Sequence, residues 1–155
     1  APYFLTGREF LSMMLRLFGR EYDEHRAKAV FSALDLEPAA LDKPVRAYSK
    51  GMTQKLGLAA CFLSGRDLYV LDEPMSGLDP KARSRAKDLV LELRSEGKTL
   101  FLTSHSLTDI EDVCDSMTVL HKGALAYTGS PQGLRDLHHE SSLERAFLKC
   151  IETHA

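Results

Sequence analysis

Two short apolar runs separated by a charged, helix-length segment constrain the fold of this 155-residue chain more than any other feature. The first run, Leu68–Leu71, ends at a pair of acids, and the second, Thr99–Thr103, follows a charged stretch from Lys81 to Glu96. Apolar runs of this length are typical of buried parallel strands, and parallel neighbours need a crossover that is usually a helix. The pattern therefore predicts an α/β sheet.

The residues before this sheet have helical periodicity and predict a small helical lobe. Thr6 and Glu9 fit a capping box at the start of one helix, a second helix is expected near 23–34, and Ser49 is placed to open a third. We therefore expect a helical subdomain at 1–64, followed by a partial core at 65–128.

The segment after the second strand predicts an antiparallel hairpin at the edge of the sheet. Lys122-Gly123 provides its turn, between apolar runs at 116–120 and 124–127. Pro131 and Ser141-Ser142 mark the starts of two short helices, which we assign to a carboxy-terminal segment at 129–155.

Composition excludes several classes of protein. The formal net charge is −2 without a long run of one sign, which argues against a nucleic-acid surface. No apolar stretch approaches the roughly 20 residues that span a bilayer, and the start does not resemble a signal peptide. The three scattered cysteines are expected to be reduced thiols, which favours the cytoplasm. The chain begins with Ala1, as though within a domain, and we expect it to be an incomplete chain.

The paired acids at the end of the first strand carry the strongest local signal for chemistry. The carboxyl ends of strands in open α/β sheets face the ligand crevice. Asp72 there can hold Mg²⁺ through water, and Glu73 beside it can deprotonate an attacking water. His105 follows the second strand, so the same edge would bring it near the acids as a phosphate sensor or a partner of the base. Taken alone, two acids after an apolar strand are more often just a solvated strand end.

A second candidate site lies at the predicted start of the third helix. Ser49 and Gly51 would combine a hydroxyl, a close backbone approach and exposed helix amides, which together make an anion site. Standing alone, Ser49 would be read as an ordinary N-cap.

Four segments in this order resemble the motifs of ABC ATPases. Tyr48–Lys55 resembles the signature motif, Leu68–Pro74 the Walker B strand, Ser76–Asp79 the D-loop, and Ser104-His105 the switch histidine. The resemblance covers nearly the whole chain. It implies an incomplete P-loop NTPase fold, in which a helical subdomain precedes a partial, mostly parallel sheet with flanking helices.

The resemblance also implies a role for each matching residue. Asp72 would bind Mg²⁺ through its hydration shell, and Glu73 would be the general base for the water that attacks the γ-phosphate. His105 would contact that phosphate, and Asp79 would reach across a dimer interface. The signature would contact ATP held by the opposite subunit, through Ser49, Lys50, Gly51, Met52 and Gln54.

The chain departs from the family pattern in three ways. Lys50 and Met52 replace the family's first signature Gly and its Gln, a variant similar to subunits that serve export-type, ABC-2-like permeases. No Gly-x-x-x-x-Gly-Lys-Ser/Thr occurs in the 155 residues, and the glutamine loop is also missing. We therefore expect ATP and Mg²⁺ to bind only in the complete subunit, and predict that this chain alone is inactive.

The resemblance implies partners and a location as well. A second ATPase subunit would pair head to tail, and a membrane permease would dock on the helical subdomain, which places the protein on the cytoplasmic face of a membrane. One alternative is a non-transport ABC ATPase, including the translation-factor relatives; the chromosome-organising kind is disfavoured because no sustained heptads precede Ser49. The other is a non-catalytic chain of this fold that self-associates through its exposed sheet.

Overall fold

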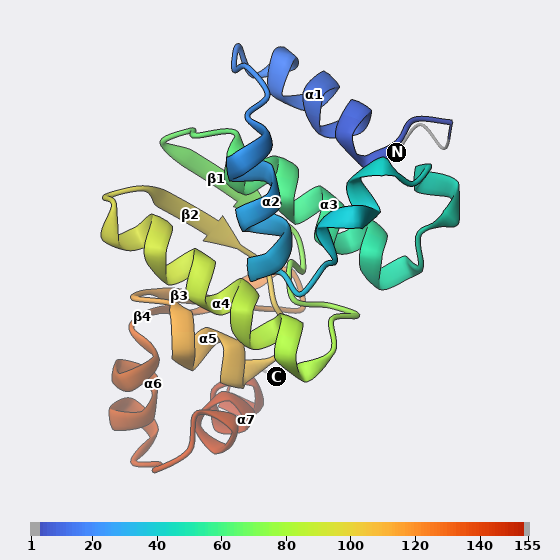
Figure 1. Ribbon diagram of the computed structural model, residues 1–155. Coiled ribbons are helices and arrows are strands. Elements are labelled where there is room, and N and C mark those ends of the chain that lie inside the picture. Colours follow the sequence, from blue (N-terminus) through green and yellow to red (C-terminus); the bar gives the residue numbers. More distant parts are fainter. Residues whose placement is uncertain (1–3, 154–155) are drawn as a thin grey trace. The chain divides into compact units, whose positions relative to one another are not determined.

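The chain divides into two compact units, Ala1–Thr103 and Ser104–Ala155. The computed structural model describes residues 4–153 (Figure 1). The first unit carries the helical lobe and a parallel strand pair, and the second carries a hairpin with three helices. No helix within residues 4–153 is long and apolar enough to cross a membrane.

Side-chain caps begin the helices of the first unit where the sequence predicts them. Thr6 forms the expected capping box with Glu9: its hydroxyl accepts a hydrogen bond from the Glu9 amide at 3.2 Å, and its own amide donates to the Glu9 carboxylate at 2.8 Å. Asp23 and Ser49 cap the next two helices. The elements in chain order are α1 (Gly7–Leu17), α2 (Glu24–Ala33), the 3-10 turns η1 (Pro38–Asp42) and η2 (Val45–Ala47), and α3 (Lys50–Leu63).

The predicted strand–helix–strand unit is confirmed. Strand β1 (Leu68–Leu71) leads into α4 (Pro80–Ser95), which returns the chain to β2 (Thr99–Leu102). The strands pair in parallel with Leu71 opposite Leu102, so both end at the same level. The residues that follow each strand therefore emerge side by side.

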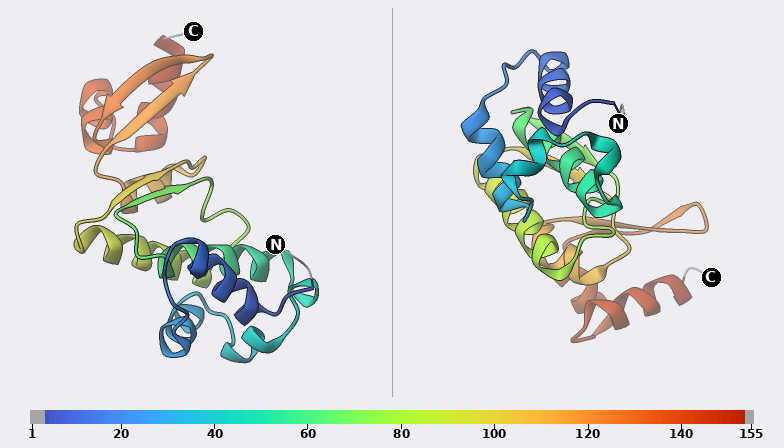
Figure 2. Two further views of the ribbon diagram at one scale, coloured as in Figure 1. Left: turned by 90° about the horizontal axis from the view of Figure 1, so that it is seen from above. Right: turned by 45° about the vertical axis from the view of Figure 1, so that its right-hand side comes forward.

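Helices cover one face of this strand pair and leave the other exposed. Figure 2 shows α3 and α4 on one side of β1 and β2. Tyr69 and Leu71 point to the buried side, whereas Leu68, Val70 and Phe101 are 58–69% exposed on the other. Parallel strands are usually covered on both faces, so this apolar surface is unusual for the fold class. The core of the helical lobe includes the fully buried residues Leu11, Phe31, Leu34, Leu41 and Leu56.

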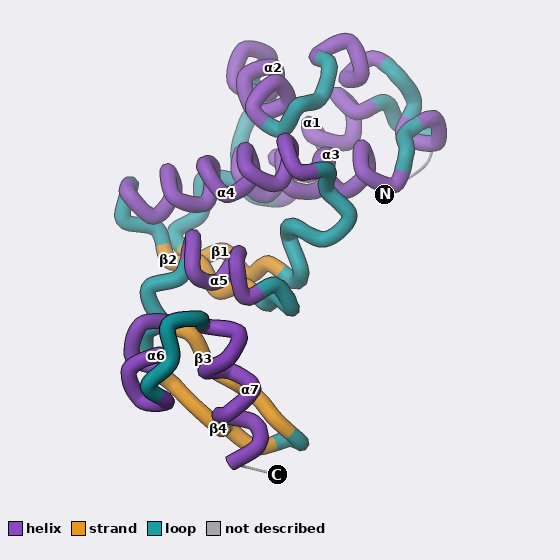
Figure 3. Tube along the Cα trace, turned by 90° about the horizontal axis from the view of Figure 1, so that it is seen from below, coloured by secondary structure: helices purple, strands orange, loops and turns teal. Residues whose placement is uncertain are grey.

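The second unit packs a hairpin against helices (Figure 3). Lys122 and Gly123 both have positive φ, 48° and 80°, which suits a tight hairpin turn. Its core consists of the buried residues Met117, Val119, Leu134, Leu143, Ala146 and Cys150. The elements are α5 (Leu107–Val113), β3 (Met117–His121), β4 (Ala124–Gly129), α6 (Pro131–His138) and α7 (Leu143–Thr153).

The hairpin is antiparallel as predicted, whereas its expected place at the edge of the α/β sheet, which lies in the other unit, stays a prediction. Within the described part of the chain, β3 and β4 pair only with each other and form a separate two-stranded sheet. The hairpin packs against α6 and α7, and packing against helices supplies the stability that an isolated two-stranded hairpin lacks. The three-part division at residues 64 and 128 stays a prediction. Within residues 4–153, Cys61, Cys114 and Cys150 form no disulfide.

Candidate active site

A threonine links the two strand ends and holds both acids. The Thr103 hydroxyl donates a hydrogen bond to Asp72 Oδ1 at 2.6 Å and accepts one from the Glu73 amide at 2.9 Å. The Thr103 amide extends the ladder by donating to the Leu71 carbonyl at 3.0 Å. The parallel register pairs Leu71 with Leu102, so Thr103 lies opposite Asp72. Leu71, Asp72, Glu73 and Thr103 all belong to the first unit.

The donor set suits Mg²⁺ held through water. Asp72 is exposed, and of its two carboxylate oxygens only Oδ1 accepts the Thr103 hydrogen bond. Mg²⁺ usually keeps several waters and takes one or two carboxylates, so a single oriented Asp fits it. Residues 4–153 contain no group of three or more His, Cys, Asp or Glu side chains that could form an all-protein metal cage. The residues therefore fit the ion through its hydration shell.

Glu73 has an uncommon backbone conformation. Its φ is +46°, in the left-handed region that few residues other than glycine, Asn and Asp adopt. Such a conformation is typically strained by about 1–3 kcal/mol and persists only when neighbouring contacts enforce it. The hydrogen bond from the Glu73 amide to Thr103, and that from the Ser76 amide to the Glu73 carbonyl at 3.0 Å, are such contacts.

The signature segment forms a capped helix start. Ser49 caps α3, and its hydroxyl accepts a hydrogen bond from the Met52 amide at 3.2 Å. Lys50 is exposed, and Gly51 is partly buried within the first turn. Amides in a first helical turn have no partner inside the helix, so this end of a 14-residue helix can receive an anion.

The loop after the acids packs along the first two turns of α3. The Gln54 side-chain amide donates to the Pro74 carbonyl at 3.5 Å, the long limit for such a bond. A Cβ on Gly51 would lie 3.7 Å from the Gly77 carbonyl oxygen. Asp79 ends the loop and caps α4 by accepting a hydrogen bond from the Ala82 amide at 3.0 Å. This bond, followed by one from Lys55, lowers the pKa of the Asp79 carboxyl below its usual range.

His105 belongs to the second unit, where it follows Ser104 and precedes the N-cap of α5. Its expected proximity to Asp72 and Glu73 stays a prediction. The structure thus brings together the acids, the loop to Asp79 and the signature helix within the first unit.

Comparisons with known proteins point to one family. A family model described as "AAA domain, putative AbiEii toxin, Type IV TA system" matches residues 16–109, more than half of the chain. An uncharacterized ABC transporter ATP-binding protein of Synechocystis is 40% identical over 130 residues, covering 82% of this chain and 37% of that protein. The uncharacterized ABC transporter ATP-binding protein YthP of Bacillus subtilis is 36% identical over 150 residues, covering 95% and 62%.

A solved structure described as "Structure of ATP binding subunit of ABC transporter" matches this fold with a TM-score of 0.87 at 28% identity, covering 97% of this chain and 64% of that chain. The chain belongs to this AAA-domain family, among the ABC transporter ATP-binding proteins. It spans 37% of the Synechocystis relative and 62% of the Bacillus relative. The predicted similarity of this chain to ABC-2-like subunits stays a prediction.

Two residues that the structure places in the site have no role in the predictions from sequence. Thr103 was assigned only to the second strand, although a hydroxyl one residue beyond an apolar parallel strand, in register with the acids, was a usable signal. Lys55 was included in the signature segment without a role, yet it is buried and contacts Asp79 at 3.3 Å.

Thr103→Val is expected to raise the Mg²⁺ concentration required for ATP turnover by the full natural protein that contains this chain. Valine keeps the shape of threonine but leaves Asp72 Oδ1 and the Glu73 amide without their shared partner. Loss of an outer partner of a metal ligand typically costs about 10–100-fold in affinity or activity. A Mg²⁺ titration of phosphate release measures the effect. Thr103→Ser, which keeps the hydroxyl, is the control, and equal titrations for the valine and serine variants would contradict the role.

Proposed function

We propose that this chain supplies the Mg²⁺-binding carboxylate and the general base of an ATP-hydrolysing site, and that the complete subunit couples hydrolysis to transmembrane transport. The observation that carries the proposal is the Thr103 hydroxyl, which joins Asp72 and the Glu73 backbone where two parallel strands end. A solvated strand end needs no such bridge. An oriented acid pair at this position suits phosphoryl transfer, in which positioning and charge provide most of the catalysis.

The roles of the two acids follow from their chemistry. Asp72 holds a water of the Mg²⁺ shell, with its orientation set by Thr103. Mg²⁺, when bound, neutralises charge on the β- and γ-phosphates. Glu73 accepts a proton from the water that attacks the γ-phosphate. The left-handed backbone at Glu73 turns the chain directly after Asp72, so that consecutive residues serve two functions.

A second subunit completes the proposed site in a head-to-tail dimer. Ser49, Lys50, Gly51, Met52 and Gln54 contact the nucleotide of the opposite subunit, and His105 contacts the γ-phosphate. Asp79 reaches across the same interface. Support comes from the capped start of α3, which offers amides to an anion, and from the loop packed beside it. One surface of the first unit would then present the signature and Asp79 together.

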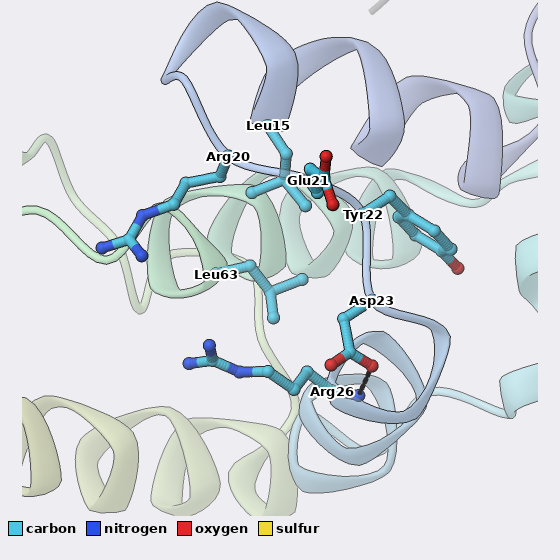
Figure 4. A pocket seen from close by; sticks show the side chains of 7 residues that line it. All are labelled: Leu15, Arg20, Glu21, Tyr22, Asp23, Arg26 and Leu63. Atoms are coloured by element: carbon cyan, nitrogen blue, oxygen red, sulfur yellow. Dashed lines mark hydrogen bonds between the residues drawn. The ribbon is translucent and has the colours of Figure 1, made fainter.

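We further propose that a membrane permease docks on the helical subdomain at a hollow of about 400 Å³ (Figure 4). Leu15 and Leu63 lie at its centre, and Arg20 and Arg26 extend along one side. The remaining lining residues, Glu21, Tyr22 and Asp23, add acidic and aromatic groups. Leu15 and Leu63 are buried at the floor of the hollow, and its accessible lining is mainly polar and charged, which suits a polar segment of the permease. Such docking would hold the subunit at the cytoplasmic face of the membrane.

The test of this function is Mg²⁺-dependent ATP hydrolysis by the full natural protein, measured beside the 155 residues alone. The full protein is expected to release phosphate only with Mg²⁺. The 155 residues alone are expected to show no turnover and no tight ATP binding, because they contain no Gly-rich loop to cradle the phosphates. A full protein without Mg²⁺-dependent hydrolysis would contradict the function, and turnover by the 155 residues would contradict the predicted inactivity.

A further inference from the structure

A buried lysine links the signature helix to the loop that ends at Asp79. Lys55 lies in the second turn of α3 and is only 7% exposed. Lysine is almost never buried this far unless its ammonium group is paired. Lys55 therefore needs partners that offset the loss of water.

The partners come from two other elements of the first unit. The Lys55 ammonium donates to the Asp35 backbone carbonyl at 3.2 Å and to Asp79 Oδ2 at 3.3 Å. Asp35 follows the end of α2 with a φ of +56°, in the left-handed region. Asp79 uses its other oxygen to cap α4 through the Ala82 amide. One ammonium group thus connects the end of α2, the body of α3 and the start of α4.

This arrangement is difficult to explain by stability alone. The Asp79 side chain is about half exposed, and ion pairs that reach solvent typically contribute little to stability. Pairs that involve a buried charge are better known for selecting one conformation than for adding stability. Here the geometry concerns the signature helix start at Ser49 and the carboxylate of Asp79, which the proposed function assigns to one dimer interface.

We propose that Lys55 is a positioning residue of the ATPase. It holds the loop 74–79 against α3, so that the signature and Asp79 are presented to the partner subunit in a single arrangement. The catalytic part of this inference rests on the proposed function, whereas the coupling of the loop to α3 does not.

A matched pair of lysine variants in the full natural protein tests the coupling. Lys55→Met removes the ammonium group with little change in volume. Lys81→Met removes an exposed ammonium that also pairs with Asp35, at 2.6 Å, but no contact of Lys81 with Asp79 is found in the described residues. Hydrogen exchange at the Leu78 and Ala82 amides is expected to rise about tenfold in Lys55→Met and less than about twofold in Lys81→Met. Equal exchange in the two variants, or a uniform rise across the first unit, would overturn the coupling.

Turnover tests the catalytic part. Lys55→Met is expected to lower kcat about tenfold or more while the Kd for ATP stays within about twofold, because positioning acts after the nucleotide has bound. Asp79→Asn keeps an oxygen that can cap α4 but replaces the charged acceptor of Lys55. Because the Asp79 side chain is about half exposed, this variant is expected to fold even if Lys55→Met does not. The double variant is expected to be no slower than the slower single variant. Additive losses would overturn the positioning role, because residues that act through one contact are not additive.

The two proposals fail in different ways. If the full protein shows no hydrolysis that depends on Glu73, the proposed function is wrong, and hydrogen exchange at Leu78 and Ala82 still decides the coupling. If hydrolysis depends on Glu73 but Lys55→Met behaves like Lys81→Met in turnover and exchange, only the inference about Lys55 is wrong.

Discussion

Glu73→Gln in the full natural protein is expected to lower ATP turnover by about 10²–10⁴-fold, the usual contribution of a general base. Glutamine keeps the size of glutamate but cannot accept the proton of the attacking water at neutral pH. The hydrogen bond from the backbone amide of residue 73 to Thr103 does not depend on the side chain, so the strand end should be unchanged. Steady-state phosphate release measures the loss.

Nucleotide binding separates this result from general damage. The Kd for ATP is expected to stay within about threefold of the natural protein, because only the attacking water has lost its base. Glu96→Gln removes one charge from the exposed C-cap of α4 and serves as the matched control, with turnover unchanged. Turnover of Glu73→Gln within about tenfold of the natural protein would mean that another group is the base.

Gly51→Asp is expected to reduce turnover by two to three powers of ten while the fold stays intact. A carboxylate about 4 Å from a phosphate charge costs about 4 kcal/mol at the effective dielectric typical of a protein surface, and about 1.4 kcal/mol corresponds to a tenfold change. The same carboxylate suits the first turn of a helix, where acids typically contribute about 0.3–1 kcal/mol to stability. Turnover should therefore fall without a fall in the melting temperature.

Gly51→Ala separates charge from bulk. A Cβ at this position would meet the Gly77 carbonyl oxygen at 3.7 Å and the Ser49 hydroxyl at 4.0 Å, both ordinary contacts. Alanine should therefore fold well and lose much less turnover than aspartate. If the two variants were equally impaired, steric exclusion would explain the effect. If neither were impaired, residue 51 would not face a phosphate.

Local patterns predicted most of the fold because they act over short distances. The capping box at Thr6, the cap at Ser49 and the two apolar strands each depend on residues a few positions apart, and all formed as predicted. The hairpin turn at Lys122-Gly123 also formed as predicted. Its place at the edge of the α/β sheet depends on strands distant in sequence that lie in the other unit, and that part stays a prediction.

The same distinction between local and distant contacts applies to the candidate site. The acids and the signature follow from short motifs, whereas Thr103 and Lys55 act through contacts 31 and 24 residues away in sequence. Their roles emerge only when a register or a helix packing is known. Helical spacing puts Lys55 on the face of α3 that carries the buried residues Leu58, Ala59 and Phe62. It does not identify Asp79 as the partner of the Lys55 ammonium group. The proximity of His105 to the acids remains a prediction because His105 belongs to the second unit and the acids to the first.

The left-handed backbone at Glu73 has a consequence for how such a protein can lose activity. Glycine at this position would relieve the strain on the chain, and asparagine or aspartate would tolerate it, whereas a β-branched residue would not. If Glu73 is the base as proposed, selection for hydrolysis and selection for folding act in opposite directions at this residue. A lineage released from the need to hydrolyse ATP would drift here toward glycine or asparagine, and a relative with either residue at this point would have kept the architecture while giving up the reaction.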